Sequence, residues 1–213
     1  MAEWLKAHAW KACRKKFHAG SNPVLSASIM KKKVNLKPFV RKNLDILFIA
    51  LNPPEISNKK GHYFSVKQSL WNQLYESGLI SEMVDKEIAD EQVFGSNKLN
   101  YNSWQYGVID LAPDIIETVG AKVKPTDDHV KKLIENICYY KPKIALIIQN
   151  RVRDKICKEN IPMNTGLIGR ILEEDYGCNT EFFLIPFPHG NSIKDQVKVD
   201  LYKKIKIFLK NHY

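Results

Sequence analysis

One apolar run constrains the fold of this chain more than any other feature. The seven residues from Leu44 to Ala50 include a single polar side chain, Asp45. A strand covered on both faces of a parallel sheet has this near-continuous apolar pattern, whereas a strand with one solvated face alternates. The run ends at Asn52-Pro53-Pro54, where proline disfavours helix in the residue before it. We therefore expect a buried parallel strand followed by a proline-containing loop.

Three further apolar segments, at 106–111, 143–149 and 181–186, are predicted to be strands. Helical patterns lie between and after them. Predicted helices start after Ser65 and after Thr126, cover 81–92, start again at 150, and cover 166–175 and the C-terminus. Alternating strands and helices favour a sheet covered on both faces. The predicted fold class is α/β, a three-layer α/β/α sandwich around a mainly parallel four-stranded sheet.

The length of 213 residues favours a single domain. We expect residues 1–43 to form a basic extension, with a helix over 3–18 and a loop, packed on a core domain of residues 44–213. No apolar run approaches the roughly 20 residues of a membrane span, and the N-terminus does not read as a secretory signal. We therefore expect a cytoplasmic, monomeric protein without membrane contact.

The four cysteines are scattered and form no Cys-x-x-Cys motif, which argues against a zinc ribbon or an iron–sulfur cluster. The segment Asp127-Asp128-His129 is better explained as the charged first turn of a helix than as a metal site. The sequence therefore predicts neither a metal nor a cofactor.

The chain has 33 Lys and Arg against 23 Asp and Glu, a net charge of +10. Such an excess suits a polyanionic partner such as DNA, although a generally lysine-rich proteome would also produce it. Several basic residues precede or enter the Asn52 loop: Lys31, Lys32, Lys33, Lys37, Arg41, Lys42, Lys59 and Lys60. The lysines of the last helix, Lys198, Lys203, Lys204 and Lys206, are expected on its solvated side, opposite Val197, Leu201, Ile205 and Phe208.

The order of motifs resembles the uracil-DNA glycosylase superfamily over about residues 44–210. The resemblance rests on the Asn52-Pro53 loop, on Gly61-His62-Tyr63-Phe64, and on a helix with Trp71 that ends at Ser77-Gly78-Leu79. It is greatest to the branch of mismatch-specific uracil and thymine glycosylases. It implies a monofunctional enzyme of DNA repair that flips a base out of double-stranded DNA and hydrolyses its N-glycosidic bond, leaving an abasic site.

The resemblance assigns roles to the residues that follow the first strand. Asn52 matches the asparagine that orients the attacking water, a role that an amide can fill because the displacement is largely dissociative. Phe64 matches the aromatic residue that stacks on the extruded base, with Pro53, His62 and Tyr63 beside it. Two alternatives stay open: Tyr63 and Phe64 as a plug of the core, and His62 as a structural residue of the loop.

The segment His189-Gly190-Asn191-Ser192 stands where the family has its DNA-penetrating loop. Phe187 and His189 depart from the family pattern, so His189 is either an electrostatic partner of the leaving base or a phosphate contact. Lys59, Lys60, Asn150 and Arg151 are further candidates for binding the DNA backbone. Because Pro54 and Phe187 are unusual, a non-catalytic binder of damaged or single-stranded DNA on the same fold is the alternative function.

Asp110 is the largest departure, because relatives commonly carry an amide or a lysine there. An ionised carboxylate accepts from an exocyclic amine and cannot donate to uracil O4. The sequence therefore predicts a modified cytosine as substrate, with defence against phage DNA as a context, and otherwise uracil or thymine in mismatches. The alternative is that Asp110 turns away from the base and caps a loop.

Overall fold

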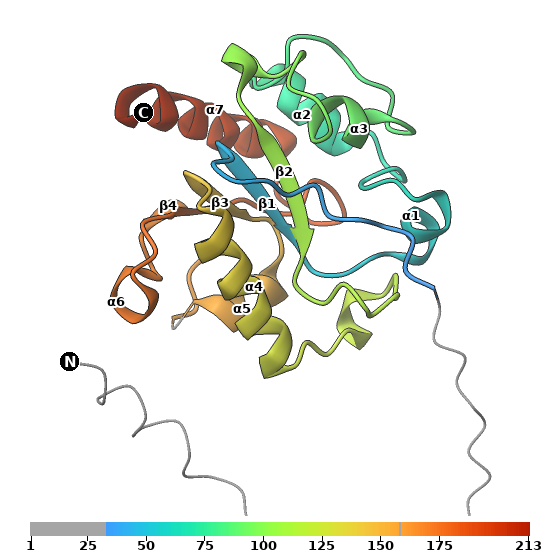
Figure 1. Cartoon of the computed structure of the whole chain (residues 1–213). Coiled ribbons are helices and arrows are strands. Elements are labelled where there is room, and N and C mark those ends of the chain that lie inside the picture. The colour runs from blue at the N-terminus through green and yellow to red at the C-terminus, as the bar shows by residue number, and fades with distance from the viewer. Residues whose placement is uncertain (1–32, 158) are drawn as a thin grey trace, which may run out of the picture. The chain divides into compact units, whose positions relative to one another are not determined.

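The computed structural model describes residues 33–157 and 159–213. The helix predicted over 3–18, together with Lys31 and Lys32, lies outside the described residues. Within them, strands and helices alternate as the sequence predicts, and the fold is a three-layer α/β/α arrangement (Figure 1).

The central sheet has five strands in the order β2-β1-β3-β5-β4. The four predicted strands form its parallel part: β1 (Ile46–Ala50), β2 (Tyr106–Asp110), β3 (Ile144–Ile147) and β5 (Glu181–Leu184). The fifth, β4 (Gly166–Gly169), pairs antiparallel with β5 at the edge.

The expectation of four strands, and of a helix over 166–175, is therefore wrong. Gly166 and Gly169 have φ of 82° and 83°, a left-handed conformation that a helix interior excludes. Periodicity alone does not distinguish an edge strand from a helix in a short apolar segment between two glycines. The helix α6 in this region is only Glu173–Tyr176.

Two apolar cores lie on the two faces of the sheet. Strand β1 alternates between them, since Ile46 and Phe48 belong to one core while Leu47 and Ile49 belong to the other. The first core is covered by α2 (Ser69–Glu76), α3 (Ala89–Val93) and α7 (Asp195–His212). The second is covered by α4 (Asp127–Tyr140) and α5 (Asn150–Ile156), on the opposite side of the sheet in Figure 1.

Some helix ends lie where the sequence predicts them and others do not. Thr126 caps α4 as predicted, and Gly78, with φ of 70°, follows α2 as predicted. Ser65 does not cap α2, because α2 begins only at Ser69; the Ser65 hydroxyl donates to His62 O at 3.0 Å. The helix predicted over 81–92 is also wrong, since α3 is short and begins only at residue 89.

The segment before β1 joins the sheet. Phe39 and Val108 exchange two backbone hydrogen bonds of 3.0 Å in an antiparallel bridge. Leu36 is buried, and the side chain of Asn58, from α1 (Glu55–Lys60), accepts hydrogen bonds from the backbone N–H groups of residues 35 and 36. No helix among residues 33–157 and 159–213 is long and apolar enough to cross a membrane.

Gly107 makes the bridge between Phe39 and β2 possible. A Cβ atom there would collide with the carbonyl oxygen of Phe39 and lie 2.6 Å from Leu44 Cδ1. Gly107→Ala should therefore lower the free energy of unfolding by about 1–3 kcal/mol, measured by urea denaturation.

The matched control is Gly120→Ala, where the nearest atom to the new Cβ is Leu51 Cδ2 at 3.7 Å. This change should stay within about 0.5 kcal/mol of wild type. Equal stability of the two variants would mean that the close approach of residue 39 to β2 does not constrain the fold.

Candidate functional site

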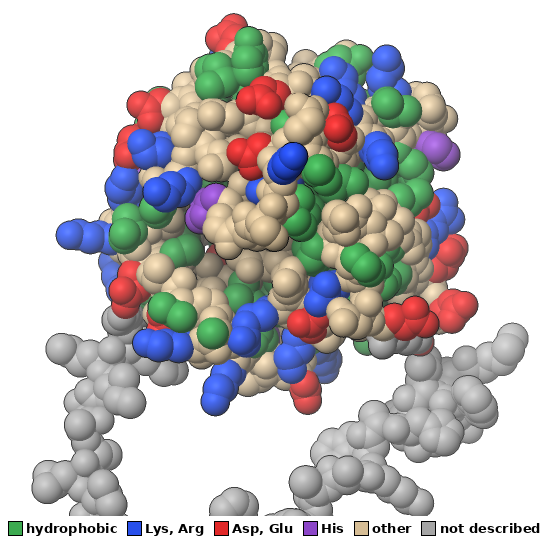
Figure 2. All heavy atoms as spheres, turned by 180° about the vertical axis from the view of Figure 1, so that it is seen from behind, with side chains coloured by type: hydrophobic (Ala, Val, Ile, Leu, Met, Phe, Trp, Pro, Cys, Tyr) green, Lys and Arg blue, Asp and Glu red, His purple; other side chains and the backbone are tan. Residues whose placement is uncertain are grey.

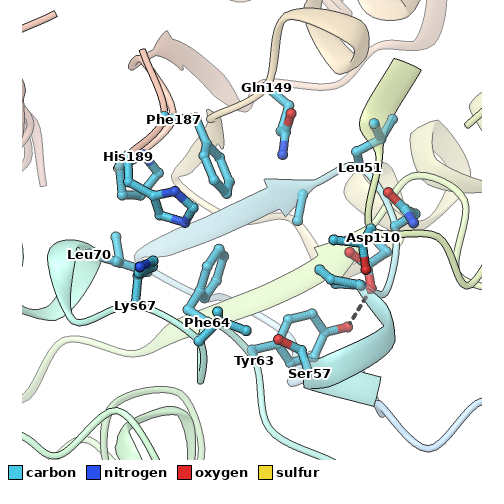
Figure 3. Close-up of a pocket in the computed structure, with 18 of the residues that line it drawn as sticks. Leu51, Ser57, Tyr63, Phe64, Lys67, Leu70, Asp110, Gln149, Phe187 and His189 are labelled. Atoms are coloured by element: carbon cyan, nitrogen blue, oxygen red, sulfur yellow. Dashed lines mark hydrogen bonds between the residues drawn. The ribbon is translucent and has the colours of Figure 1, made fainter. Parts of the chain in front are cut away.

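A pocket of about 430 Å³ opens where the parallel strands end. Asn52 follows β1, Asp110 ends β2, Gln149 follows β3, and Phe187 and His189 follow β5. Tyr63 and Phe64 close the pocket from the segment between α1 and α2 (Figure 3). The site therefore lies at the carboxyl edge of the sheet, where open α/β folds bind ligands.

Asn52 is held by its amide nitrogen. Nδ2 donates to the carbonyl oxygens of Glu117 at 2.7 Å, Ile115 at 2.9 Å and Pro53 at 3.2 Å. Carbonyl oxygens only accept, so the nitrogen must face them. Asn52 is 7% exposed and lines the pocket, and Oδ1 is the atom of its amide left to accept a hydrogen bond from a ligand.

The same contacts tie two loops together. Glu117 N donates to Pro53 O at 3.2 Å, and Glu55 N donates to Thr118 Oγ1 at 3.2 Å. Pro53, which the sequence predicts beside the base, is buried and does not line the pocket, whereas Pro54, which precedes α1, does. The loop after β2 therefore fixes the loop after β1.

Both members of the aromatic pair after α1 contact the core and line the pocket. Tyr63 is 4% exposed and belongs to the first core, whereas Phe64 is half-buried and packs against that core. The Phe64 ring contacts the rings of Tyr63, Trp71 and Phe94 at centroid distances of 6.1–6.4 Å. In Figure 3, Phe64 and Phe187 point toward the same space from opposite sides.

Phe64 also has a backbone φ of 53°. A bulky residue rarely adopts this left-handed conformation, and such strain concentrates at functional sites. The surrounding aromatic rings fix the orientation of this side chain.

Asp110 forms the deep wall of the pocket with Tyr63. The Tyr63 hydroxyl donates to Asp110 Oδ2 at 2.9 Å, while the buried Oδ1 has no hydrogen-bond partner among the described residues. Burial raises the pKa of Asp110 to about 7, and the hydrogen bond from Tyr63 limits the rise. The carboxyl therefore changes charge near neutral pH, and one of its oxygens is left for a ligand.

A second hollow of about 370 Å³ lies against the same wall. Tyr63 and Asp110 line it together with Leu36, Asp114 and His129. His129 and Asp114 are paired across 2.7 Å. The Tyr63–Asp110 pair therefore separates two cavities.

His62 turns away from the pocket. Its Nδ1 lies 2.9 Å from Asp90 Oδ1, and Asp90 Oδ2 accepts from Tyr63 N at 2.7 Å. Asp90 is fully buried, so this pair fixes the loop that carries the aromatic residues. Of the two roles considered for His62, the geometry favours the structural one.

His189 lies at the opposite side of the pocket from Asp110 in Figure 3, packed against Phe187 with ring centroids 4.8 Å apart. Burial lowers its pKa, and the charges of Lys67 and Lys198 lower it further. The imidazole is therefore neutral at neutral pH and can donate one hydrogen bond.

The loop after His189 is internally bonded. Asn191 Nδ2 donates to Phe187 O at 2.7 Å, and Gly190 has a φ of 72°. Gly190 lines the pocket, whereas Asn191 and Ser192 are exposed beside it.

The predicted backbone-binding residues are dispersed. Lys59 is exposed, but Lys60 pairs with Glu87 at 2.7 Å. Asn150 and Arg151 are exposed at the start of α5, and Arg151 donates to Val123 O at 3.2 Å. Figure 2 shows basic side chains mixed with acidic ones over one face rather than gathered in one track.

Several pocket residues were not among the sequence-based candidates: Ser57, Lys67, Glu117, Thr118 and Gln149. Gln149 could have been found, because it is the second residue after β3, as Asn52 is the second residue after β1. Glu117 and Thr118 carry no such signal, since their position depends on how their loop folds. The described residues hold no group of three or more His, Cys, Asp or Glu that could bind a metal.

Comparison with known families agrees with this geometry. The family model described as the Uracil DNA glycosylase superfamily matches residues 37–205, which include the sheet and the pocket. No protein in a curated collection matches the chain.

The raised pKa of Asp110 makes stability depend on pH. The carboxyl has a pKa of about 7 in the fold against an ordinary 3.8, so the folded state holds an additional proton between these values. Its contribution is fully present below about pH 4 and is lost as pH rises through about 7. Asp110→Asn does not titrate, and should reduce the loss of unfolding free energy between pH 5 and pH 8 by about 3 kcal/mol.

Urea unfolding at the two pH values measures this difference. Asp127→Asn is the control, because Asp127 is exposed in the first turn of α4 and should leave the wild-type difference unchanged. If Asp110→Asn also left it unchanged, Asp110 would be ionised throughout this range.

Proposed function

This chain belongs to the uracil DNA glycosylase superfamily, and from that premise we propose that it is a monofunctional DNA glycosylase that flips a base out of double-stranded DNA and hydrolyses its N-glycosidic bond. The family supports DNA glycosylase activity and DNA as the partner. The observation that carries the mechanism is Asn52, whose Nδ2 is bound to three carbonyls while its side chain lines the pocket.

In the proposed reaction, Asn52 Oδ1 accepts a hydrogen bond from a water and aims it at the anomeric carbon of the deoxyribose. The bond from that carbon to the base nitrogen breaks, and its electron pair leaves with the base. The water oxygen bonds to the carbon, its extra proton passes to solvent, and the expelled base is protonated in turn. An amide is sufficient because the sugar already has oxocarbenium character when water attacks.

The leaving base is held between aromatic rings in this proposal. Phe64 stacks on one of its faces, and Phe187 contacts it from the opposite side of the pocket. The neutral imidazole of His189 donates a hydrogen bond to the oxygen on which negative charge develops. Of the two roles considered for His189, its place on the pocket wall favours that of partner to the leaving base.

We propose hydrolysis without a covalent lysine intermediate. Lys67 is the only lysine that lines the pocket among the described residues. In Figure 3 it lies beside Leu70 and His189, on the opposite side from Asp110. We therefore expect borohydride to trap no covalent protein–DNA adduct under conditions in which the base is released.

We propose a base with an exocyclic amine as substrate, and a modified cytosine in particular. Asp110 Oδ1 is buried without a partner among the described residues, and the Tyr63 hydroxyl already occupies Oδ2. An exocyclic amine would give Oδ1 its missing hydrogen bond. An enzyme that released unmodified cytosine would damage its own genome, so the target is a modified form, with phage DNA as one source.

The first test of the reaction is Asn52→Ala in single-turnover base release. Loss of the positioned oxygen should lower the rate by about 10²-fold or more. Because Nδ2 also holds three carbonyls, we expect thermal stability to fall as well. Binding to a duplex that already contains an abasic-site analogue separates the two effects, since it requires the fold but no chemistry.

Asn97→Ala is the matched control, because Asn97 is half-buried, its Nδ2 donates to the Ser103 carbonyl, and it does not line the pocket. It should release bases at the wild-type rate. A rate near wild type in Asn52→Ala would exclude Asn52 from water positioning. Duplex binding by the wild type, with no base released from any duplex tested, would favour the non-catalytic alternative.

The second test compares wild type with Asp110→Asn on duplexes that contain cytosine, 5-hydroxymethylcytosine, uracil, or thymine opposite guanine. Wild type should favour the modified cytosine, because its amine donates to Asp110. The amide of the variant can donate to uracil O4, so its preference should move toward uracil. An identical preference for uracil in both proteins would place base recognition elsewhere.

A further inference from the structure

Lys198, near the start of α7, is buried although the sequence predicts it on the solvated side of that helix. Its side chain is 2% exposed, whereas Lys203 on the same helix is 48% exposed. A lysine is almost never fully buried unless it is paired, because desolvating an ammonium group is costly. Its contacts must therefore compensate for the loss of water.

Those contacts converge on the loop that carries His189. Lys198 Nζ donates to Pro188 O and to Asp195 Oδ1, both at 3.1 Å. Gln73 Nε2, from α2, donates to the same two oxygens at 2.9 and 3.1 Å. Donors from two helices therefore occupy the carbonyl directly before His189.

A carbonyl oxygen has two lone pairs, so two donors saturate it and leave the Pro188 peptide little freedom to rotate. Proline fixes its own φ, and Asn191 binds the carbonyl of Phe187 on the other side. The carbonyls of Phe187 and Pro188, at the start of the pocket-lining segment, are thereby both held. A loop that enters a duplex needs this rigidity, because the stacked bases oppose it.

The charge of Lys198 has a second effect. The charged groups around His189 are Lys67, before α2, and Lys198 with Asp195 on α7. Asp195 is 66% exposed, so solvent screens it, whereas the charge of Lys198 is screened little. Both lysines disfavour a second proton on the imidazole.

We propose that Lys198 is a positioning residue for the reaction: with Gln73 it fixes the Pro188 carbonyl so that His189 faces the pocket, and it brings a positive charge close to the imidazole. This inference rests on the proposed function, in which the neutral ring donates to the leaving base. It explains why the buried position 198 holds an ammonium group, although an apolar side chain would fill the same space.

Three variants separate the hydrogen bond from the charge. Gln73→Met removes one donor to Pro188 O and leaves every charge in place. Lys67→Met removes one charge near His189 and leaves both donors in place. Lys198→Met removes a donor and a charge together, and Lys203→Met is the control for an exposed lysine of α7 that pairs with Asp200.

Two measurements on the free protein are independent of activity. NMR titration of the His189 ring should give a higher pKa in Lys198→Met and Lys67→Met, and the wild-type pKa in Gln73→Met and Lys203→Met. Amide hydrogen exchange at Ile193, whose N–H donates to Asn191 Oδ1 at 3.1 Å in the same loop, should be faster by about tenfold in Lys198→Met and Gln73→Met only. If Lys198→Met does not fold, the other two variants still test the charge and the hydrogen bond separately.

A third measurement connects the residue to the reaction. Single-turnover release from the preferred duplex of the panel should be slower by about tenfold in Lys198→Met and Gln73→Met, and should keep the wild-type rate in Lys203→Met.

An unchanged His189 titration in Lys198→Met, or equal effects of Lys198→Met and Gln73→Met on that titration, would overturn the role of the charge. Hydrogen exchange at the wild-type rate in both Lys198→Met and Gln73→Met would overturn the role of the hydrogen bonds. If the wild type released no base, the proposed function would fail while the titration and exchange results would still stand by themselves.

Discussion

The amide nitrogen of Asn52 fixes the geometry on which the pocket depends. By binding carbonyls of Pro53, Ile115 and Glu117, it joins the loop after β1 to the loop after β2. These hydrogen bonds also determine which atom of the amide can bind a ligand. Because Nδ2 faces three carbonyl oxygens, Oδ1 is left to accept a hydrogen bond. One buried side chain therefore sets both the shape of the wall and the polarity that this wall presents to a substrate.

The sequence predicts the parallel strands and the edge at which they end, because near-continuous apolar runs have one common interpretation. It could thereby place Asn52 and Asp110 at one site before any contact was known. It could not predict β4, since two glycines around an apolar pair satisfy strand and helix alike. It also could not predict the burial of Lys198, because that depends on acceptors from a loop and a second helix, which periodicity within α7 does not report.

The net charge of +10 overstates how much of the basic surface is available to a polyanion. Lys60 is neutralised by Glu87, and the Arg41 guanidinium donates to Gln105 and to the carbonyls of Phe94 and Tyr106. Residues 1–32 hold seven Lys and Arg against one Glu, so more than half of the net charge comes from that segment of the sequence. The net charge of a sequence therefore measures attraction to a charged partner only when the side chains that are bonded within the fold are left out of the count.

The wall formed by Tyr63 and Asp110 has a cavity on each side instead of a continuous core behind it. Most binding pockets deepen only at the cost of packing, because the atoms behind the wall belong to the core. Here a smaller side chain at position 63 would connect two existing spaces, and the hollow near His129 and Asp114 would become part of the pocket. A single substitution there would therefore enlarge the space open to a ligand, at the cost of the hydrogen bond from Tyr63 to Asp110.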